Sequence, residues 1–248
     1  MSGSAPLSCI IYDLDGTLVD SAADITAAVN RLRESLALEP LDEAQVRRFV
    51  GDGARRMIER AVFGIVDDPA DRPERTLPRS AGDVDQLLKQ LISIYEEAPV
   101  ERTVVVPGAE IGLRRWRAQG IAQVVLTNKP HRIANAVLEE LGLLELLDVV
   151  IGRGAVDDAG NPVPDKPDPA VLDVILEDVG AERDETWVVG DGPSDVEFAR
   201  ACGIPCVTIL GGYGEISRLE AAGYDPEFAA ADFPAAMEIL TKRTHVAV

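Results

Sequence analysis

The second half of the chain alternates short apolar runs with segments of helical length. Four such runs lie at residues 121–126, 148–151, 186–189 and 205–209, and a fifth, residues 7–12, lies near the start of the chain. Strands that alternate with helices of about 10 to 15 residues are joined by right-handed crossovers and form a parallel sheet covered by helices on both faces. The pattern therefore predicts an α/β protein with a doubly wound, Rossmann-like core.

The block between the first run and the others has a different pattern. Residues 20–98 show apolar positions at helical spacing and no convincing strand, and within them residues 67–83 are rich in proline and charge and are predicted to form a loop. We therefore expect an all-helical cap domain of residues 20–98, inserted into a catalytic core of residues 1–19 and 99–248. The cap is expected to lie over the carboxyl ends of the strands, where open α/β sheets bind ligands.

Charge and composition restrict the binding partners and the cellular location that we expect. The 248 residues include 24 lysines and arginines and 43 aspartates and glutamates, a formal charge of −19, which disfavours non-specific attraction to nucleic acid or anionic membranes. The sequence holds no uninterrupted apolar stretch of about 18 residues, the length of a membrane span. Three cysteines without metal-ligand spacing, and an N-terminus without a basic leader, favour a cytoplasmic location.

Polar clusters follow four of the apolar runs. In chain order they comprise Asp13 with Asp15, Thr127, Lys166, and Asp191 with Asp195. Any one of these clusters alone is as readily a turn or a helix cap. Because parallel strands present their carboxyl ends at one edge of a sheet, the ordered set predicts a single site.

The residue types at this edge suit phosphate chemistry. Asp13 and Asp191 offer hard carboxylate oxygens, which suit Mg²⁺, an ion that takes one or two carboxylates together with a substrate phosphate. Such an ion would offset the repulsion between a carboxylate nucleophile and a phosphate dianion. Thr127 supplies a hydroxyl and Lys166 a fixed cation for the non-reacting phosphate oxygens. We therefore expect a magnesium-dependent site that acts on a phosphorylated small molecule.

Several of these residues also have a purely structural interpretation, which the sequence leaves open. Asn128, two residues before Pro130, is typical of a helix start. Lys166 is compatible with a solvated loop lysine, the usual place for that residue type. Asp195 is equally suited to interact with the dipole of the helix that it begins.

Taken in order, four motifs resemble those of the haloacid dehalogenase superfamily. They are Asp13-x-Asp15-Gly-Thr-Leu-Val-Asp20, Leu126-Thr127-Asn128-Lys129, Asp165-Lys166-Pro167-Asp-Pro169 and Val189-Gly190-Asp191-Gly-x-x-Asp195. With Pro107-Gly108 and Gly211-Gly-Tyr-Gly214, the chain is most similar to the phosphoglycolate phosphatase branch. The resemblance covers nearly the whole chain.

This resemblance implies specific roles for the site residues. Asp13 would be the nucleophile and Asp15 the general acid and base, while Thr127, Asn128 and Lys166 would bind the substrate. The Mg²⁺ ion would be held by Asp13, the main-chain carbonyl of Asp15 and Asp191, with support from Asp195. Dehalogenases of the superfamily generally lack the second acid, because a halide leaves without a proton whereas an alkoxide does not.

The resemblance also suggests a substrate. Residues 50–57 resemble the cap segment of phosphoglycolate phosphatases, so Arg55 or Arg56 is expected to meet a substrate carboxylate, with a solvated helix arginine as the alternative. The expected activity is hydrolysis of a small phosphate monoester, 2-phosphoglycolate, through a phospho-aspartate, by a monomer or homodimer. A phosphomutase or a pyrophosphatase on the same core stays open. A phospho-aspartate signalling switch is disfavoured by Asp15 and by the cap.

Overall fold

The computed structural model describes residues 7–243 of the chain. Its central feature is a six-stranded sheet in the order β5-β4-β1-β6-β7-β8, in which every neighbouring pair is parallel. The strands are β1 Cys9–Tyr12, β4 Ala122–Pro130, β5 Val149–Arg153, β6 Thr186–Gly190, β7 Cys206–Ile209 and β8 Ala229–Ala230. Each of the five predicted apolar runs forms one strand, whereas the two-residue β8 is too short to leave a periodic signal.

Strand β1 lies inside the sheet, between β4 and β6, and is buried on both faces. Ile10 and Tyr12 enter the hydrophobic core on one face, and Cys9 and Ile11 enter the core on the other. Because successive side chains alternate between two covered faces, a polar side chain finds no solvated position along this strand. The first polar side chain after the strand is that of Asp13, at the edge of the sheet.

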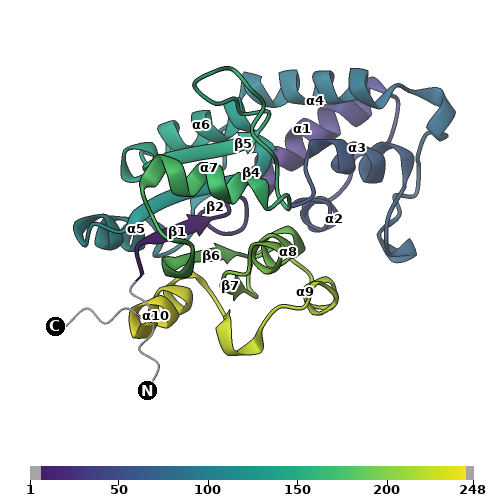
Figure 1. Cartoon of the computed structure of the whole chain (residues 1–248). Helices are drawn as coiled ribbons and strands as arrows, with labels where there is room; N and C mark the ends of the chain where they lie inside the picture. Colours follow the sequence, from purple (N-terminus) through teal and green to yellow (C-terminus); the bar gives the residue numbers. More distant parts are fainter. Residues whose placement is uncertain (1–6, 244–248) are drawn as a thin grey trace.

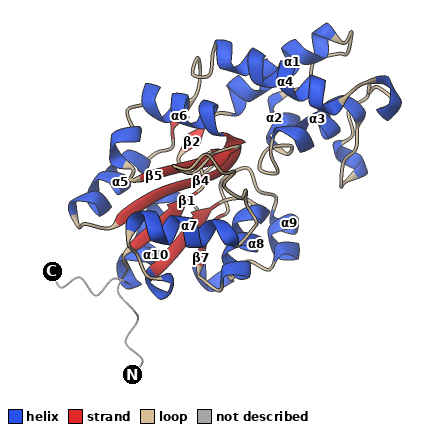
Figure 2. Cartoon of the chain, turned by 45° about the horizontal axis from the view of Figure 1, so that its top comes forward, coloured by secondary structure: helices blue, strands red, loops and turns tan. Residues whose placement is uncertain are grey.

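Helices cover both faces of the sheet (Figure 2). On one face lie α5 Ala109–Ala118, α6 His131–Glu140 and α10 Phe233–Arg243, and on the other lie α7 Ala170–Val179 and α8 Pro193–Cys202, with α9 Ile216–Ala222 packed against α8. The buried side chains of Trp116 on the first face and Phe198 on the second anchor these layers. The arrangement confirms the predicted doubly wound core.

Four helices between the first strand and the rest of the core form a separate group beyond one end of the sheet (Figure 1). They are α1 Ala22–Ser35, α2 Glu43–Arg47, α3 Ala54–Phe63 and α4 Val84–Glu97. The predicted loop, residues 67–83, contains only two single turns of 3₁₀-helix, η1 Pro69–Asp71 and η2 Arg79–Ala81. No helix among residues 7–243 is long and apolar enough to cross a membrane.

A short antiparallel pair of strands stands where the chain enters and leaves the helical group. β2 Val19–Asp20 pairs with β3 Val104–Val105, so the two connections between core and cap run side by side. The division into a cap of residues 20–98 and a core of the remaining residues stays a prediction, and the β2–β3 pair lies near both of its boundaries.

Asp24, near the start of α1, fastens the returning connection. Its buried carboxylate accepts hydrogen bonds from the backbone N–H groups of Glu101 (3.1 Å), Arg102 (2.9 Å) and Thr103 (2.8 Å), and from the Thr103 hydroxyl (2.6 Å). Burial by itself would raise the pKa of Asp24, but these hydrogen bonds outweigh it and lower the pKa below its usual value. One ionised side chain thus fixes the path from α4 back into the core.

We predict that Asp24→Ala lowers the free energy of unfolding at pH 7 by about 2–4 kcal/mol, because three backbone N–H groups lose their acceptor inside the protein. Urea denaturation followed by circular dichroism measures the change. Asp24→Asn keeps one acceptor oxygen and is expected to lose less. An Asp24→Ala protein with the wild-type urea midpoint would show that the connection is held by other contacts.

Candidate active site

Asp13 lies at the carboxyl end of β1, at the centre of the site. Its backbone N–H donates to the Val189 carbonyl of β6 (2.9 Å), which continues the sheet register by one residue. The polar residues at the carboxyl ends of β4 and β6 therefore lie on either side of Asp13. The structure brings together all but one of the predicted site residues, namely Asp13, Asp15, Thr127, Asn128, Lys166, Asp191 and Asp195. Their roles in chemistry and binding stay predictions.

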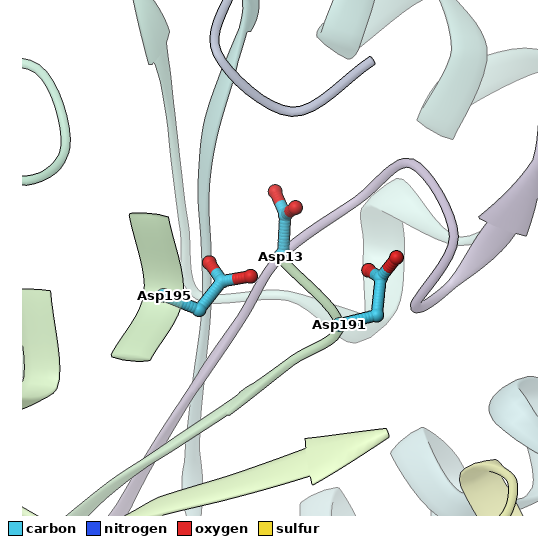
Figure 3. Close-up of side chains that lie close together, drawn as sticks. All are labelled: Asp13, Asp191 and Asp195. Carbon is cyan, nitrogen blue, oxygen red and sulfur yellow. The ribbon is translucent and has the colours of Figure 1, made fainter. Parts of the chain in front are cut away.

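Three buried carboxylates gather at this point. Asp13, Asp191 and Asp195 each present a carboxylate oxygen, and these oxygens lie within 4.8 Å of one another (Figure 3). Asp191 follows β6 and accepts hydrogen bonds from the Thr17 hydroxyl and from the Tyr213 backbone N–H, both at 2.6 Å. Asp195 lies in the first turn of α8 and accepts the backbone N–H of Gly192 (2.9 Å).

Lys166 supplies positive charge to this cluster. Its Nζ donates to Asp195 Oδ1 (2.5 Å) and lies 3.0 Å from Asp13 Oδ1, and its side chain is only 2% exposed. Burial would lower the pKa of Lys166, but the charges of Asp13 and Asp195 raise it above its usual value. Lys166 is therefore a buried cation, and its interpretation as a solvated loop lysine is wrong.

One lysine does not balance three carboxylates. Burial raises the pKa of Asp13 to about 6 against the opposing charge of Lys166. Burial, followed by the charges of Asp13 and Asp195, raises the pKa of Asp191 to about 8. A divalent cation is the kind of group that would relieve this accumulation of negative charge.

The packing around the carboxylates fits such a cation. Asp13 Oδ1 is buried, and its ion-pair partner among the described residues is Lys166 Nζ at 3.0 Å, a cation that Asp195 shares. Gly16 has a φ of 90°, and a Cβ atom there would lie 2.3 Å from Asp191 Oδ2. Hard oxygens kept clear of side chains are the ligands that magnesium-like ions take.

Asp15 has two partners that the sequence did not reveal as site residues. Its Oδ1 accepts hydrogen bonds from Ser21 Oγ (2.5 Å) and Lys129 Nζ (2.8 Å), and Lys129 also donates to the Tyr95 hydroxyl (2.8 Å). Lys129 belongs to the recognised motif, but a sequence does not show that a lysine is buried. Tyr95 comes from α4, 80 residues after Asp15, so only the packing of α4 brings it there.

Thr127 and Asn128 lie on the last part of β4. The Thr127 hydroxyl accepts the backbone N–H of Lys129 (3.2 Å), and Asn128 Nδ2 donates across to the cap at the Gly51 carbonyl (3.1 Å). Helix α6 starts at His131 after Pro130, and Asn128 does not cap it, so the interpretation of Asn128 as a helix start is wrong. Asp195, in contrast, contacts both the helix start and Lys166.

Arg55 is the predicted site residue that the structure places elsewhere. It lies on α3, its side chain is 46% exposed, and its guanidinium pairs with Asp85 of α4. It does not line the cavity beside Asp13. Arg56, the alternative, pairs with Glu59 and Asp67.

A cavity of about 60 Å³ opens beside Asp13 and Asp15, between the sheet edge and the helical group. Its walls combine Thr127, Asn128, Lys129, Pro130 and Ile133 of the core with Ile25, Ala28, Val50, Gly51, Gly53, Ala54, Met57, Leu91, Ile92 and Tyr95 of the predicted cap. Both parts of the chain are therefore needed to enclose whatever binds next to Asp13.

Tyr213, in the Gly211–Gly214 segment, connects the carboxylate cluster to the start of the cap. Its backbone N–H donates to Asp191 Oδ2. Its hydroxyl accepts hydrogen bonds from the backbone N–H groups of Ser21 (2.8 Å) and Ala22 (3.0 Å) and donates one to Asp20 Oδ1 (2.7 Å). One side chain thus fixes the first helix of the cap relative to Asp191.

Comparison with known proteins gives a consistent result. A model of the haloacid dehalogenase-like hydrolases matches residues 7–203. The phosphoglycolate phosphatase of Rhodospirillum rubrum is 36% identical over 222 residues, which cover 89% of this chain and 87% of that protein. The phosphoglycolate phosphatase of Chromobacterium violaceum is 33% identical over 219 residues, 87% of this chain and 90% of that protein. A solved structure, a predicted phosphoglycolate phosphatase from Haemophilus somnus, superposes with a TM-score of 0.78 at 26% identity and covers 96% of this chain and 99% of its own.

The raised pKa of Asp191 predicts that the negative charge of this side chain lowers the stability of the folded protein. A carboxyl group whose pKa rises from 3.8 to about 8 on folding binds a proton in the folded state that the unfolded state releases, so the metal-free protein loses stability as the pH rises through this window. Asp191→Asn removes the charge and can still accept from Tyr213 and donate to Thr17. In excess chelator at pH 8, we expect this variant to be more stable than the wild type by about 1–2 kcal/mol.

Urea denaturation at pH 5 and pH 8 measures this effect. Because the carboxyl group ionises near pH 3.8 in the unfolded state and near pH 8 in the folded state, the advantage of Asp191→Asn should be smaller at pH 5 than at pH 8 and should vanish only below the unfolded pKa. Asp24→Asn serves as the control, because the pKa of Asp24 is shifted downward and the variant should be less stable than the wild type at pH 8. An Asp191→Asn protein that is less stable than the wild type at pH 8 would contradict the electrostatic account of the cluster.

Proposed function

This chain belongs to the haloacid dehalogenase-like hydrolase family, and on that premise we propose that it is a Mg²⁺-dependent phosphatase that hydrolyses 2-phosphoglycolate through a phospho-aspartate at Asp13. The observation that carries the proposal is the position of Asp13, a buried carboxylate between the cation of Lys166 and the carboxylates of Asp191 and Asp195, with the acid Asp15 two residues further on. The relatives named phosphoglycolate phosphatase, at 33–36% identity over most of the chain, support the choice of substrate.

Mg²⁺ would be held by Asp13, Asp191 and the main-chain carbonyl of Asp15, with Asp195 in support. The raised pKa values of the buried carboxyl groups of Asp13 and Asp191 support this assignment, because a divalent cation would offset the repulsion between them. When bound, the ion supplies positive charge that offsets the repulsion between the Asp13 carboxylate and the phosphate.

In the first step, an Asp13 carboxylate oxygen attacks phosphorus, and the bond between phosphorus and the ester oxygen breaks. Asp15 gives its proton to the departing alkoxide, which leaves as the alcohol group of glycolate. Lys166 and the Thr127 hydroxyl would hold the non-reacting phosphate oxygens while negative charge develops on them in the transition state. The phosphoryl group is then on Asp13.

In the second step, a water molecule attacks the phosphorus of the phospho-aspartate. Asp15, now a carboxylate, takes a proton from this water, and the bond between phosphorus and the Asp13 oxygen breaks. Inorganic phosphate leaves, and both aspartates return to their starting states. Ser21 and Lys129, which hold Asp15 Oδ1 in place, keep the same group available for both proton transfers.

We predict that the protein with Mg²⁺ has its highest kcat/KM for 2-phosphoglycolate among a panel that includes hexose phosphates, pyrophosphate and nucleoside monophosphates. Excess chelator should abolish turnover, and added Mg²⁺ should restore it, because three crowded carboxylates repel the phosphate without the ion. Steady-state phosphate release measures both effects. A higher value for pyrophosphate, isomerisation of a sugar phosphate without phosphate release, or undiminished activity in chelator would each contradict the proposal.

We predict that Asp15→Asn loses about 10²- to 10⁴-fold in the turnover of 2-phosphoglycolate, because neither proton transfer has a carrier. With an aryl phosphate, whose phenolate leaves without a proton, the first step should recover in part while hydrolysis of the intermediate does not. The variant should then release a burst of about one equivalent of phenolate and carry a phosphoryl group on Asp13, which intact-protein mass spectrometry detects. Asp13→Asn should show neither signal, and a phosphoryl group on another residue would refute the mechanism.

A further inference from the structure

Lys129 is a buried cation in the cavity wall that the mechanism above uses only as a partner of Asp15. Its side chain is 2% exposed, and its Nζ lies 4.6 Å from the centre of the Tyr95 ring. An ammonium group carries three protons to donate. Among the described residues, Asp15 Oδ1 and the Tyr95 hydroxyl take two of them, which leaves one for a ligand.

The walls around Lys129 restrict what that ligand can be. The charged residues that line the cavity are Asp13, Asp15 and Lys129, and most of the wall contributed by the helical group is apolar. A negative group that enters an apolar cavity without a partner loses its hydration at high cost. Among the residues that line the cavity, Lys129 is the cation that a negative charge on the leaving group would pair with.

The distance between Asp15 and Lys129 sets the length of the leaving group. Asp15 must reach the ester oxygen to transfer its proton, and Lys129 Nζ lies 2.8 Å from an oxygen of the same carboxylate. In the phosphate ester of a 2-hydroxy acid, the ester oxygen and the carboxylate are attached to the same carbon. A longer acid would carry its carboxylate away from Lys129 and toward the apolar part of the wall.

From these contacts we infer that Lys129 is a specificity-determining residue, which binds the carboxylate of a phosphorylated 2-hydroxy acid while Asp15 serves the ester oxygen. The inference rests on the proposed function and deepens it, since it names the residue that binds the carboxylate of the substrate. It takes the place of Arg55 or Arg56, which the sequence suggested for this role and which pair with carboxylates outside the cavity.

The test combines two enzymes with two substrates. 2-Phosphoglycolate and its amide, phosphoglycolamide, have nearly the same shape and differ in charge. The wild type with Mg²⁺ is expected to prefer the carboxylate, and the ratio of the two kcat/KM values is expected to fall about 10- to 100-fold in Lys129→Met, the usual effect of removing a hydrogen bond between charged groups. An effect of Lys129 that acts only through Asp15 changes both substrates alike and cancels in this ratio.

Two further variants make the test specific. Lys129→Gln can still donate to Asp15 and Tyr95 but has no charge, so its ratio should fall as in Lys129→Met, and it also serves if the methionine variant does not fold. Arg55→Met removes a cation of the cap outside the cavity and should keep the wild-type ratio. Near-ultraviolet circular dichroism checks that each variant is folded.

The outcomes separate the inference from the proposed function. A wild type that prefers 2-phosphoglycolate to its amide, together with Lys129 variants that keep this preference, overturns the role of Lys129 and leaves the proposed function standing. Loss of the preference in Arg55→Met overturns it as well. A wild type that hydrolyses neither substrate, or that treats both alike, contradicts the proposed substrate and the inference together.

Discussion

The confinement of three carboxylates and one lysine to a space a few ångströms across governs much of the rest of the structure. Asp13, Asp191 and Asp195 repel one another in a buried site, and Lys166 offsets only part of that repulsion. Side chains that repel one another stay close together only when rigid elements hold them, because flexible segments would let them move apart. Two parallel strands and the first turn of α8 provide that rigidity, with β1 itself supported by neighbours on both sides.

The helical group of α1 to α4 supplies the second wall of the cavity beside Asp13. The connections that attach it are short, and each is fixed by a polar side chain. Asp24 holds the chain that returns from α4, and Tyr213 holds the start of α1 and contacts Asp191 through its backbone. Asn128 reaches from β4 to the cap at Gly51. The cap side of the cavity wall is therefore held in position by residues beside the carboxylate cluster.

This arrangement separates two tasks. In the proposed function, the core groups around Asp13 act on the phosphoryl group, which is common to all phosphate monoesters. The rest of the substrate would then meet the cavity between core and cap, where the wall is largely apolar and Lys129 is the buried lysine. Asp15 stands at the boundary, because the same carboxylate faces the ester oxygen and contacts Lys129.

The sequence by itself determined the core and most of the residues at its edge. Fully buried strands leave continuous apolar runs, and the polar residue that ends such a run, like Asp13 after β1, lies where the strand reaches the sheet edge. Helical periodicity likewise identified the block that contains α1 and α4, because an amphipathic face repeats along the chain.

Only the tertiary structure decided which side chains meet across long sequence separations. The burial of Lys129 and Lys166 and the contact between Lys129 and Tyr95 depend on how α4 and the loops pack against the strand ends. The same holds for Arg55, which a sequence pattern places near the substrate but which packing turns toward Asp85. Local patterns record the period of an element and the face that it buries, whereas the position of one element on another is set by contacts between residues far apart in the chain.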